Sequence, residues 1–142
     1  MIVPDINLLI YTHDSGSRFH DLSRRWWEEC LSTEIMVGLA WATILGFIRI
    51  TTSPTAFANP LPVRTATSLV GAWLEQPNVQ VIHPGKRHPE LFLGFLNSLG
   101  TAANLTTDAH LAALAVEHQA ELHSTDTDFA RFSGLRWKNP LE

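Results

Sequence analysis

Four aspartates stand out in this chain of 142 residues because each borders a short apolar run. Asp5 follows the first four residues, Asp108 begins an alanine-rich segment, and Asp126 and Asp128 follow a third run. Carboxylate oxygens are hard ligands that suit Mg²⁺, or else Mn²⁺, rather than zinc. We therefore expect Asp5, Asp108 and Asp126 to bind a metal ion together, with Asp128 as a fourth catalytic acid.

A divalent cation held between carboxylates can activate water and stabilise negative charge on a phosphate. The aspartates thus predict metal-dependent hydrolysis of a phosphodiester, in which water attacks in line with the leaving oxygen. Taken singly, each also has a structural explanation. Thr106 is a plausible N-cap, so Asp108 would lie in a first helical turn, where the helix dipole lowers its pKa. Asp128 could cap a short helix, and Asp5 could be a strand end in water.

Three polar residues are candidates for orienting the site or its substrate, namely Asn7, Thr43 and Ser124. Asp5 lies inside an apolar run and must be paired, protonated or metal-bound, because an isolated buried charge is costly. Asn7 is close enough in sequence to hold Asp5 by a hydrogen bond.

Other chemistries find less support in the sequence. None of the seven histidines has zinc-site spacing, and no G-x-S-x-G, P-loop or G-x-G-x-x-G motif occurs. The single cysteine, Cys30, cannot form an internal disulfide, and its place on a helix argues against a nucleophile. The net charge of −4 argues against bulk electrostatic binding of nucleic acid, although short clusters of basic residues could converge on the site.

The N-terminus does not read as a signal peptide, because it has no early Lys or Arg and two polar residues interrupt its apolar run. No apolar stretch has the length needed to cross a bilayer. We therefore expect a cytoplasmic protein that makes no use of a membrane.

The order of elements predicts an α/β fold in a single domain, residues 1–142. Strands are expected at 2–4 with an exit at 8–10, and at 35–39, 79–82, 121–124 and 135–137. Helices are expected at 20–32, 41–52, 62–75, 88–99 and 106–119, with a single turn at 128–132. Strands separated by helices indicate a mostly parallel sheet, and ligands bind at the carboxyl ends of such strands. The helix at 41–52 is apolar on nearly every face, so one face is expected to form a subunit interface.

Three segments, 3–10, 104–115 and 124–129, resemble the PIN-domain ribonucleases, and more narrowly the VapC toxins of bacterial VapBC toxin–antitoxin pairs. Segments 41–51 and 134–141 resemble a mycobacterial-type subgroup of these toxins. The resemblance implies a PIN-like three-layer fold, with a mostly parallel central sheet flanked by helices. It implies a Mg²⁺-dependent endoribonuclease acting on structured RNA, with tRNA favoured, a VapB-type antitoxin as partner, and a homodimer. It matches Asp5 and Asp108 to the principal metal ligands, and Asp126 and Asp128 to a late acidic pair.

One departure from the family pattern concerns the second long helix, where many PIN domains carry a Glu. Residues 45–49 contain no acid, so Thr43 or a water would take its place, or the site is weaker. A PIN-fold binding module without activity is therefore an alternative. A small-molecule phosphohydrolase is a further alternative, suggested by Asp126-Thr127-Asp128.

Overall fold

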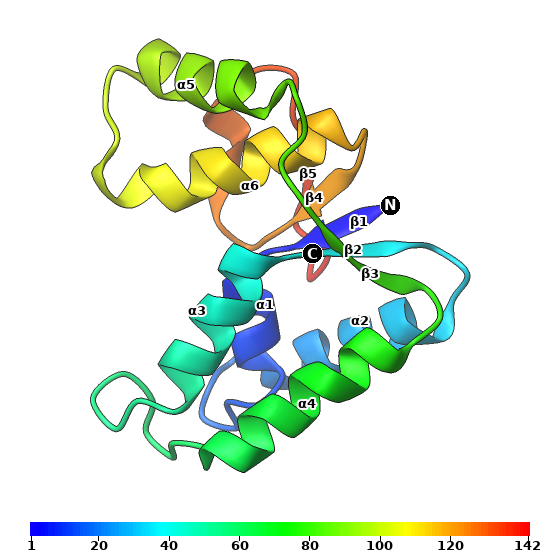
Figure 1. Ribbon diagram of the computed structural model, residues 1–142. Helices are drawn as coiled ribbons and strands as arrows, with labels where there is room; N and C mark the ends of the chain where they lie inside the picture. The colour runs from blue at the N-terminus through cyan, green and yellow to red at the C-terminus, as the bar shows by residue number, and fades with distance from the viewer.

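A five-stranded parallel sheet forms the centre of the protein, and Figure 1 shows helices on both of its faces. The computed structural model describes residues 1–142. The strands lie in the order β3-β2-β1-β4-β5, so the central strand β1, at the start of the chain, pairs with β4 from near its end. The strands are β1 (Ile2–Pro4), β2 (Val37–Ala40), β3 (Val79–Ile82), β4 (Glu121–His123) and β5 (Arg136–Lys138). The expected α/β class with a parallel sheet is confirmed.

Six α-helices and two short 3₁₀ turns complete the fold. The helices are α1 (Ile6–Tyr11), α2 (His20–Ser32), α3 (Trp41–Thr51), α4 (Val63–Glu75), α5 (His88–Leu99) and α6 (Thr106–Glu117). The 3₁₀ turns are η1 (Ala103–Leu105) and η2 (Thr127–Arg131). In Figure 1, α1 to α4 lie on one side of the sheet, and α5 and α6 lie on the other.

Two separate hydrophobic cores give the fold its three layers. The first fills the space between the sheet and α1 to α4, and it includes Leu8, Phe47 and Trp73. The second lies between the sheet and α6, where the small alanine side chains let the helix approach closely. Phe129 and Phe132 close this second core at the end of the chain's last helical turn. Neither core is lined by the four aspartates.

The expected strand exit at 8–10 is wrong, because these residues lie in the helix α1. Leu8, Leu9 and Ile10 are buried, and Asp5 accepts a hydrogen bond from the N–H of Ile6 as the N-cap of this helix. A short run that is apolar throughout has no periodicity to separate a buried strand from a buried helix. The capping aspartate therefore decides the structure here.

Three capping assignments also differ from expectation. Helix α6 begins at Thr106, and its N-cap position is Leu105, which has no side chain that can cap. Asp126, rather than Asp128, caps η2 by accepting a hydrogen bond from the N–H of Asp128. Pro62 occupies the N-cap position of α4 instead of the first helical position. Other element boundaries differ from expectation by one or two residues.

The faces of α3 have unequal environments. Ile44 and Phe47 are buried in the first core, whereas Trp41 is 50% exposed and Leu45 is 62% exposed. One apolar side of this helix is therefore uncovered in the single chain. None of the helices has both the length and the apolar character needed to span a membrane.

Candidate active site

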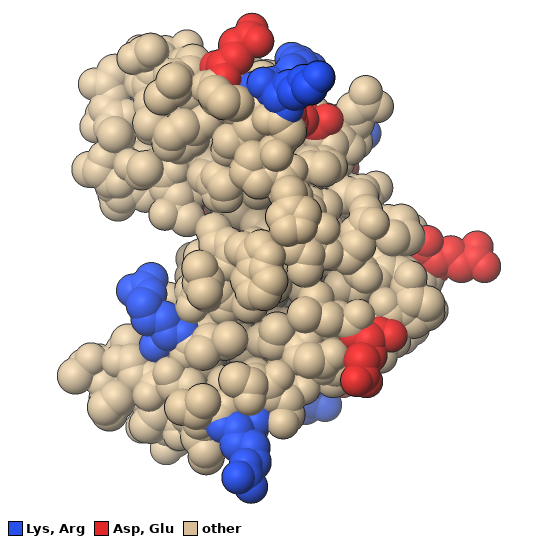
Figure 2. Space-filling view, in the orientation of Figure 1, with Lys and Arg blue, Asp and Glu red and all other residues tan.

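A cleft of about 350 Å³ lies at the carboxyl edge of the sheet, where β1 and β4 end and α3 and α6 begin. Figure 2 shows a notch between the half of the molecule that carries α5 and α6 and the half that carries α3 and α4. Three of the four candidate aspartates, Asp5, Asp108 and Asp126, line the cleft. Parallel sheets bind ligands at this edge, and the fold brings these carboxylates together there.

Asp5 is the most deeply placed acid, with only 5% of its surface exposed. One carboxylate oxygen accepts the N–H of Ile6 at 2.7 Å, and the other accepts the hydroxyl of Ser124 at 2.7 Å. Burial raises the pKa of Asp5 above its usual value, although these two hydrogen bonds work in the opposite direction. Asp5 forms no salt bridge, so no protein cation neutralises its charge.

Ser124 connects the two ends of the chain at this site. Its hydroxyl donates to Asp5, and its oxygen accepts the N–H of Asp126 at 3.0 Å. Asp126 in turn accepts the N–H of Asp128 at 2.9 Å. These bonds hold Asp5, directly after β1, and Asp126, in the loop after β4, in one fixed arrangement.

Asp108 enters the cleft from the first turn of α6. Burial raises its pKa to about 7, and the charges of Asp5, Asp126 and Asp128 add to this effect. The expectation that the helix dipole would lower the pKa of Asp108 is therefore wrong. Desolvation and three neighbouring carboxylates outweigh the dipole of a single helix.

Asp128 lies beside the cleft but does not line it. Its carboxylate is half exposed and lies 4.0 Å from the guanidinium of Arg131, a distance that makes at most a weak surface ion pair. Asp128 still contributes to the negative potential at Asp108.

The three polar candidates have different positions. Asn7 is exposed and lines the cleft, but the bond expected between Asn7 and Asp5 is absent, and Ser124 makes it instead. Thr43 is fully buried, and its hydroxyl donates to the backbone oxygen of Pro4 at 3.5 Å. Thr43 therefore supports the backbone next to Asp5 and does not line the cleft in place of the missing acid.

Sequence reasoning missed Arg49, which lines the cleft from α3. It is exposed and lies one helical turn after Leu45, which also lines the cleft. Arg49 could have been recognised as the one charged residue on an otherwise apolar helix. An arginine at a cleft is well suited to contact a phosphate group.

No group of three or more His, Cys, Asp or Glu side chains lies close enough together to form a ready-made metal centre. The cleft therefore differs from a closed structural metal site, which holds its ion with protein ligands alone. Its donors are nevertheless carboxylate oxygens, which suit a hard divalent cation. The roles of Asp5, Asp108 and Asp126 as metal ligands stay a prediction.

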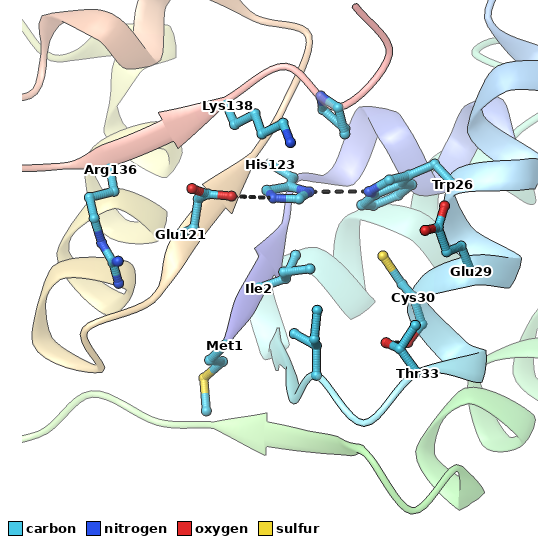
Figure 3. A pocket seen from close by; sticks show the side chains of 12 residues that line it. Met1, Ile2, Trp26, Glu29, Cys30, Thr33, Glu121, His123, Arg136 and Lys138 are labelled. Atoms are coloured by element: carbon cyan, nitrogen blue, oxygen red, sulfur yellow. Dashed lines mark hydrogen bonds and ion pairs between the residues drawn. The ribbon is translucent and has the colours of Figure 1, made fainter.

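A second hollow, of about 440 Å³, lies away from these aspartates, between α2 and the ends of β1, β4 and β5. Figure 3 shows Trp26, Cys30, His123 and Lys138 facing it. Both nitrogens of His123 are occupied, one by the indole N–H of Trp26 at 3.1 Å and one by Glu121 at 2.8 Å. His123 is therefore not free to act as a base.

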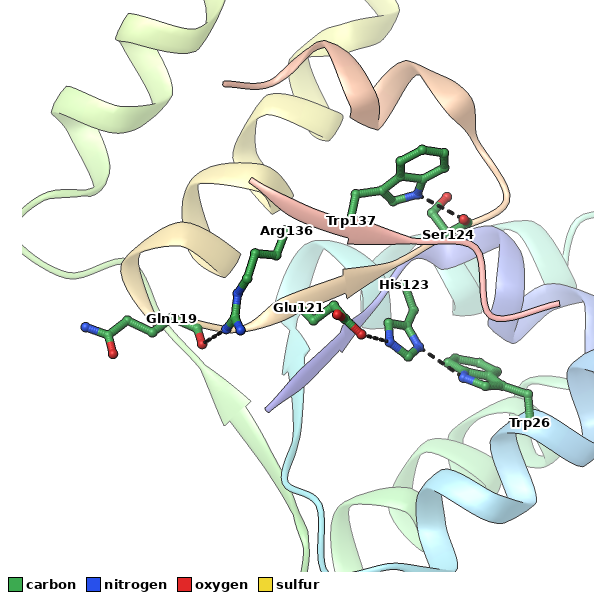
Figure 4. A network of polar contacts seen from close by, with 7 residues as sticks. All are labelled: Trp26, Gln119, Glu121, His123, Ser124, Arg136 and Trp137. Carbon is green, nitrogen blue, oxygen red and sulfur yellow. Dashed lines mark hydrogen bonds and ion pairs between the residues drawn. The ribbon is translucent and has the colours of Figure 1, made fainter. Parts of the chain in front are cut away.

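Further hydrogen bonds lie at the strand edge that leads to Ser124. In Figure 4, Trp137 of β5 donates its indole N–H to the backbone oxygen of Ser124, at 3.0 Å, and Arg136 bonds to the backbone oxygen of Gln119. These contacts, with the pairing of β4 and β5, hold the backbone next to Ser124.

Comparisons with known proteins agree on a family. The model of the PIN domain matches residues 2–135. Ribonuclease VapC33 of Mycobacterium tuberculosis is 47% identical over 141 residues, which is 99% of this chain and 99% of the relative. Ribonuclease VapC37 of the same organism is 43% identical and covers 99% of this chain and 97% of its own length.

Solved structures agree on the fold. The toxin VapC20 of M. tuberculosis, described as cleaving the sarcin–ricin loop, superposes with a TM-score of 0.69 at 17% identity, covering 96% of this chain and 99% of its own. VapBC2 from Rickettsia felis, solved on a promoter DNA fragment, gives a TM-score of 0.71 at 14% identity and 98% coverage of both chains. The PIN-like arrangement of sheet and helices is thereby confirmed.

Proposed function

The chain belongs to the VapC ribonucleases of the PIN-domain family, and on that premise we propose that it is the toxin of a VapBC toxin–antitoxin pair. Its activity in this proposal is Mg²⁺-dependent endonucleolytic cleavage of structured RNA, with tRNA favoured. The observation that carries the proposal is the cleft at the carboxyl edge of the sheet, lined by Asp5, Asp108 and Asp126.

The donor chemistry of the cleft supports Mg²⁺, with Mn²⁺ as a substitute. Asp5, Asp108 and Asp126 would hold the ion. Mg²⁺ usually keeps several waters in proteins, so a carboxylate can also hold the ion through one of them, and the site does not require a ready-made cluster of three direct protein ligands. A divalent cation would also offset the repulsion between carboxylates that share this poorly solvated cleft.

When bound, Mg²⁺ would supply activation of water and neutralisation of charge on the phosphate. The chain's own residues would provide position. Ser124 and the N–H of Ile6 hold Asp5 in one orientation, and the N–H of Asp128 orients Asp126. Arg49 at the cleft would contact a phosphate oxygen of the substrate. Water attack of this kind leaves a 5′-phosphate on one product.

The partner in this proposal is a VapB-type antitoxin that covers the cleft and excludes RNA. Structural neighbours that are VapBC complexes support such a partner. The substrate RNA is found in the cytoplasm, and we place the toxin there, acting without a membrane.

A homodimer is also part of the proposal, because Trp41 and Leu45 leave an apolar side of α3 uncovered. Light scattering at micromolar concentration should give the mass of a dimer for the wild type. Trp41→Glu should shift it toward the monomer, and a monomeric wild type would contradict this part of the proposal.

An inactive binding module is the alternative, and one observation favours it. Helix α3 contains no Asp or Glu, so this side of the cleft contributes no carboxylate. A folded protein that cleaves no RNA with Mg²⁺ or Mn²⁺ would support the alternative.

The test is cleavage of purified tRNA, with an RNA hairpin of the sarcin–ricin type as a second substrate. We expect cleavage that needs Mg²⁺, stops in EDTA and leaves 5′-phosphate ends. Asp108→Ala should lose at least about 100-fold in activity, because Asp108 would hold the cation that stabilises transition-state charge, and losing such a stabilising interaction typically costs about 100-fold or more. Asp21→Ala is the matched control, because Asp21 is also an acid in a first helical turn, that of α2.

Two results would redirect the proposal. Cleavage that persists in EDTA would exclude a metal-dependent nuclease. Turnover of a chromogenic phosphate ester at a rate that rivals RNA would favour a small-molecule phosphohydrolase.

A further inference from the structure

A third hollow, of about 450 Å³, adjoins the carboxylate cleft. Ala42 and Thr107 line both spaces, so the two are neighbours along one edge of the protein. Ala42 is the second residue of α3, directly after β2, and Pro84 lies two residues after β3. Since β3, β2 and β1 are adjacent in the sheet, the hollow continues the carboxyl edge beyond the cleft.

The walls of the hollow carry no charged side chain. Ala42, Pro84 and Phe92 are apolar, and the remaining lining residues are two threonines and two histidines. A phosphate group would find no cation here. A flat, uncharged group with a polar edge fits this lining, and the bases of a single-stranded RNA are such groups.

A pair of histidines supplies the polar edge. Nε2 of His88 and Nδ1 of His110 lie 3.0 Å apart and share one hydrogen bond. The other nitrogen of His88, Nδ1, is buried without a partner. A buried N–H without a partner is rarer than a buried acceptor without one, so the proton of His88 belongs on Nε2. His88 then donates to His110.

This tautomer has a consequence for His110. Its Nδ1 accepts from His88, so a neutral His110 carries its own proton on Nε2 and can donate it to a ligand. His110 lines the hollow, and Nε2 has no partner in the protein. Thr106 and Thr107 are exposed and also line the hollow.

We propose that this hollow binds the base of a nucleotide next to the cleaved phosphodiester, with His110 donating a hydrogen bond to an acceptor on the base edge. The inference rests on the proposed ribonuclease function and adds a specificity site to it. Asp108 and His110 are two residues apart in α6, about 3 Å along the helix axis, and they serve different spaces. One strand of RNA can therefore reach both.

The first test uses an RNA that the wild type cleaves, with one abasic nucleotide placed in turn at each position around the cut. We expect kcat/KM to fall roughly tenfold for an abasic nucleotide at one flanking position, the scale of one bound base. His110→Phe keeps a flat ring and removes the donor. It should lower kcat/KM for the intact RNA and reduce the effect of the abasic nucleotide at that position alone. Thr106→Phe, an exposed change that fills the hollow, should abolish the positional penalty.

His83→Phe is the matched control, because His83 is exposed and does not line the hollow. It should keep both the rate and the positional penalty of the wild type. An equal penalty in the wild type, His110→Phe and Thr106→Phe would overturn the inference, as would the absence of any sensitive position.

A binding experiment separates this inference from the proposed activity. A fluorescein-labelled, single-stranded hexanucleotide RNA is titrated against the Asp108→Asn protein, and anisotropy is measured with each abasic version. The base site is supported if an abasic nucleotide at one position weakens binding, and if this difference disappears in the double variant Asp108→Asn, Thr106→Phe. This result would hold even if the wild type cleaves no RNA. Cleavage without positional sensitivity in either experiment would support the nuclease and refute the base site.

Discussion

At the residue scale, the small side chain of Ser124 connects two of the acids that line the cleft. It is fully buried, it donates to Asp5, and it accepts from the backbone of Asp126. Removing its hydroxyl would leave one oxygen of a buried carboxylate without a donor. A hydrogen bond to a charged group contributes about 1.5–3 kcal/mol, so the loss is expected to matter for both stability and activity.

Ser124→Ala should therefore lower RNA cleavage by roughly 10- to 100-fold, because 1.4 kcal/mol corresponds to a factor of ten. The measurement is kcat/KM on the cleaved RNA together with urea unfolding. Ser32→Ala is the control, since the Ser32 hydroxyl also makes a hydrogen bond, but at the exposed end of α2. Wild-type activity in Ser124→Ala would mean that Asp5 keeps its orientation without this donor.

Cys30 offers a second prediction at this scale. Its thiol is buried, and burial raises its pKa to about 12. Only the thiolate reacts, and at pH 8 a thiol with this pKa is ionised at about one part in ten thousand. Alkylation by iodoacetamide should be very slow in the native protein, should accelerate as the pH rises toward 12, and should become fast in urea. Rapid labelling of native protein at pH 8 would contradict the buried position.

The residues of the site could be predicted only in part from the sequence. Asp5, Asp108 and Asp126 were recognisable only in combination, because each acid alone could be a helix cap or a strand end, whereas ligands bind at the carboxyl ends of the strands in a parallel α/β fold. The partner of Asp5 was not, because Ser124 is 119 positions away and Asn7 is a near neighbour. Hydrogen-bond partners depend on side-chain directions that only the folded chain defines.

At the element scale, the close approach of α1 and α3 shapes the floor of the cleft. A Cβ on Gly46 would lie 2.8 Å from Cδ1 of Ile6 and 3.3 Å from its Cγ1 and Cγ2, so any larger residue would force the Ile6 side chain to move. Gly46 also lines the cleft itself. This contact could not be predicted, because residues 8–10 of α1 were expected as a strand exit. An apolar run as short as 8–10 leaves helix and strand equally plausible, and a wrong element hides its packing partners.

Gly46→Ala should destabilise the protein by about 1 kcal/mol. Crowding against Ile6 typically costs about 1–3 kcal/mol, which exceeds the roughly 0.5–1 kcal/mol that alanine contributes to a helix. The RNA-cleavage rate should fall as well, because α1 carries Asp5 at its N-cap. Gly71→Ala in α4 is the matched control, since nothing lies within 4 Å of the added carbon, and it should raise stability slightly. Chemical denaturation measures both, and equal effects of the two changes would refute the argument.

At the scale of the whole molecule, the order β3-β2-β1-β4-β5 explains how distant segments build one site. The chain begins in a central strand and returns beside it more than a hundred residues later, so Asp5 and Ser124 meet at one edge. The alternation of strands and helices made the sheet predictable, as did the resemblance of three short segments to PIN domains. The strand order was not predictable from that alternation alone, because several orders satisfy the same pattern.

The carboxylates gathered at the cleft also affect the stability of the whole molecule. Without a cation, Asp108 is repelled by Asp5, Asp126 and Asp128 across a poorly solvated cleft. Asp108→Asn removes this repulsion, so in EDTA the variant should melt a few degrees above the wild type, at roughly 2–8 °C per kcal/mol of relief. Asp21→Asn, at an exposed first helical turn, should leave the melting temperature unchanged.

Mg²⁺ should raise the melting temperature of the wild type more than that of Asp108→Asn. A ligand that binds only the folded state stabilises it by about 2.7 kcal/mol at 100 times its dissociation constant. The melting temperature of the wild type and of Asp21→Asn should therefore rise with Mg²⁺, measured by scanning calorimetry, whereas Asp108→Asn should respond weakly. If Asp108→Asn melts below the wild type in EDTA, or gains as much from Mg²⁺, then the four aspartates do not act as one electrostatic unit. The four aspartates interact because the fold places the two ends of the chain side by side. Melting temperatures test this interaction without any RNA.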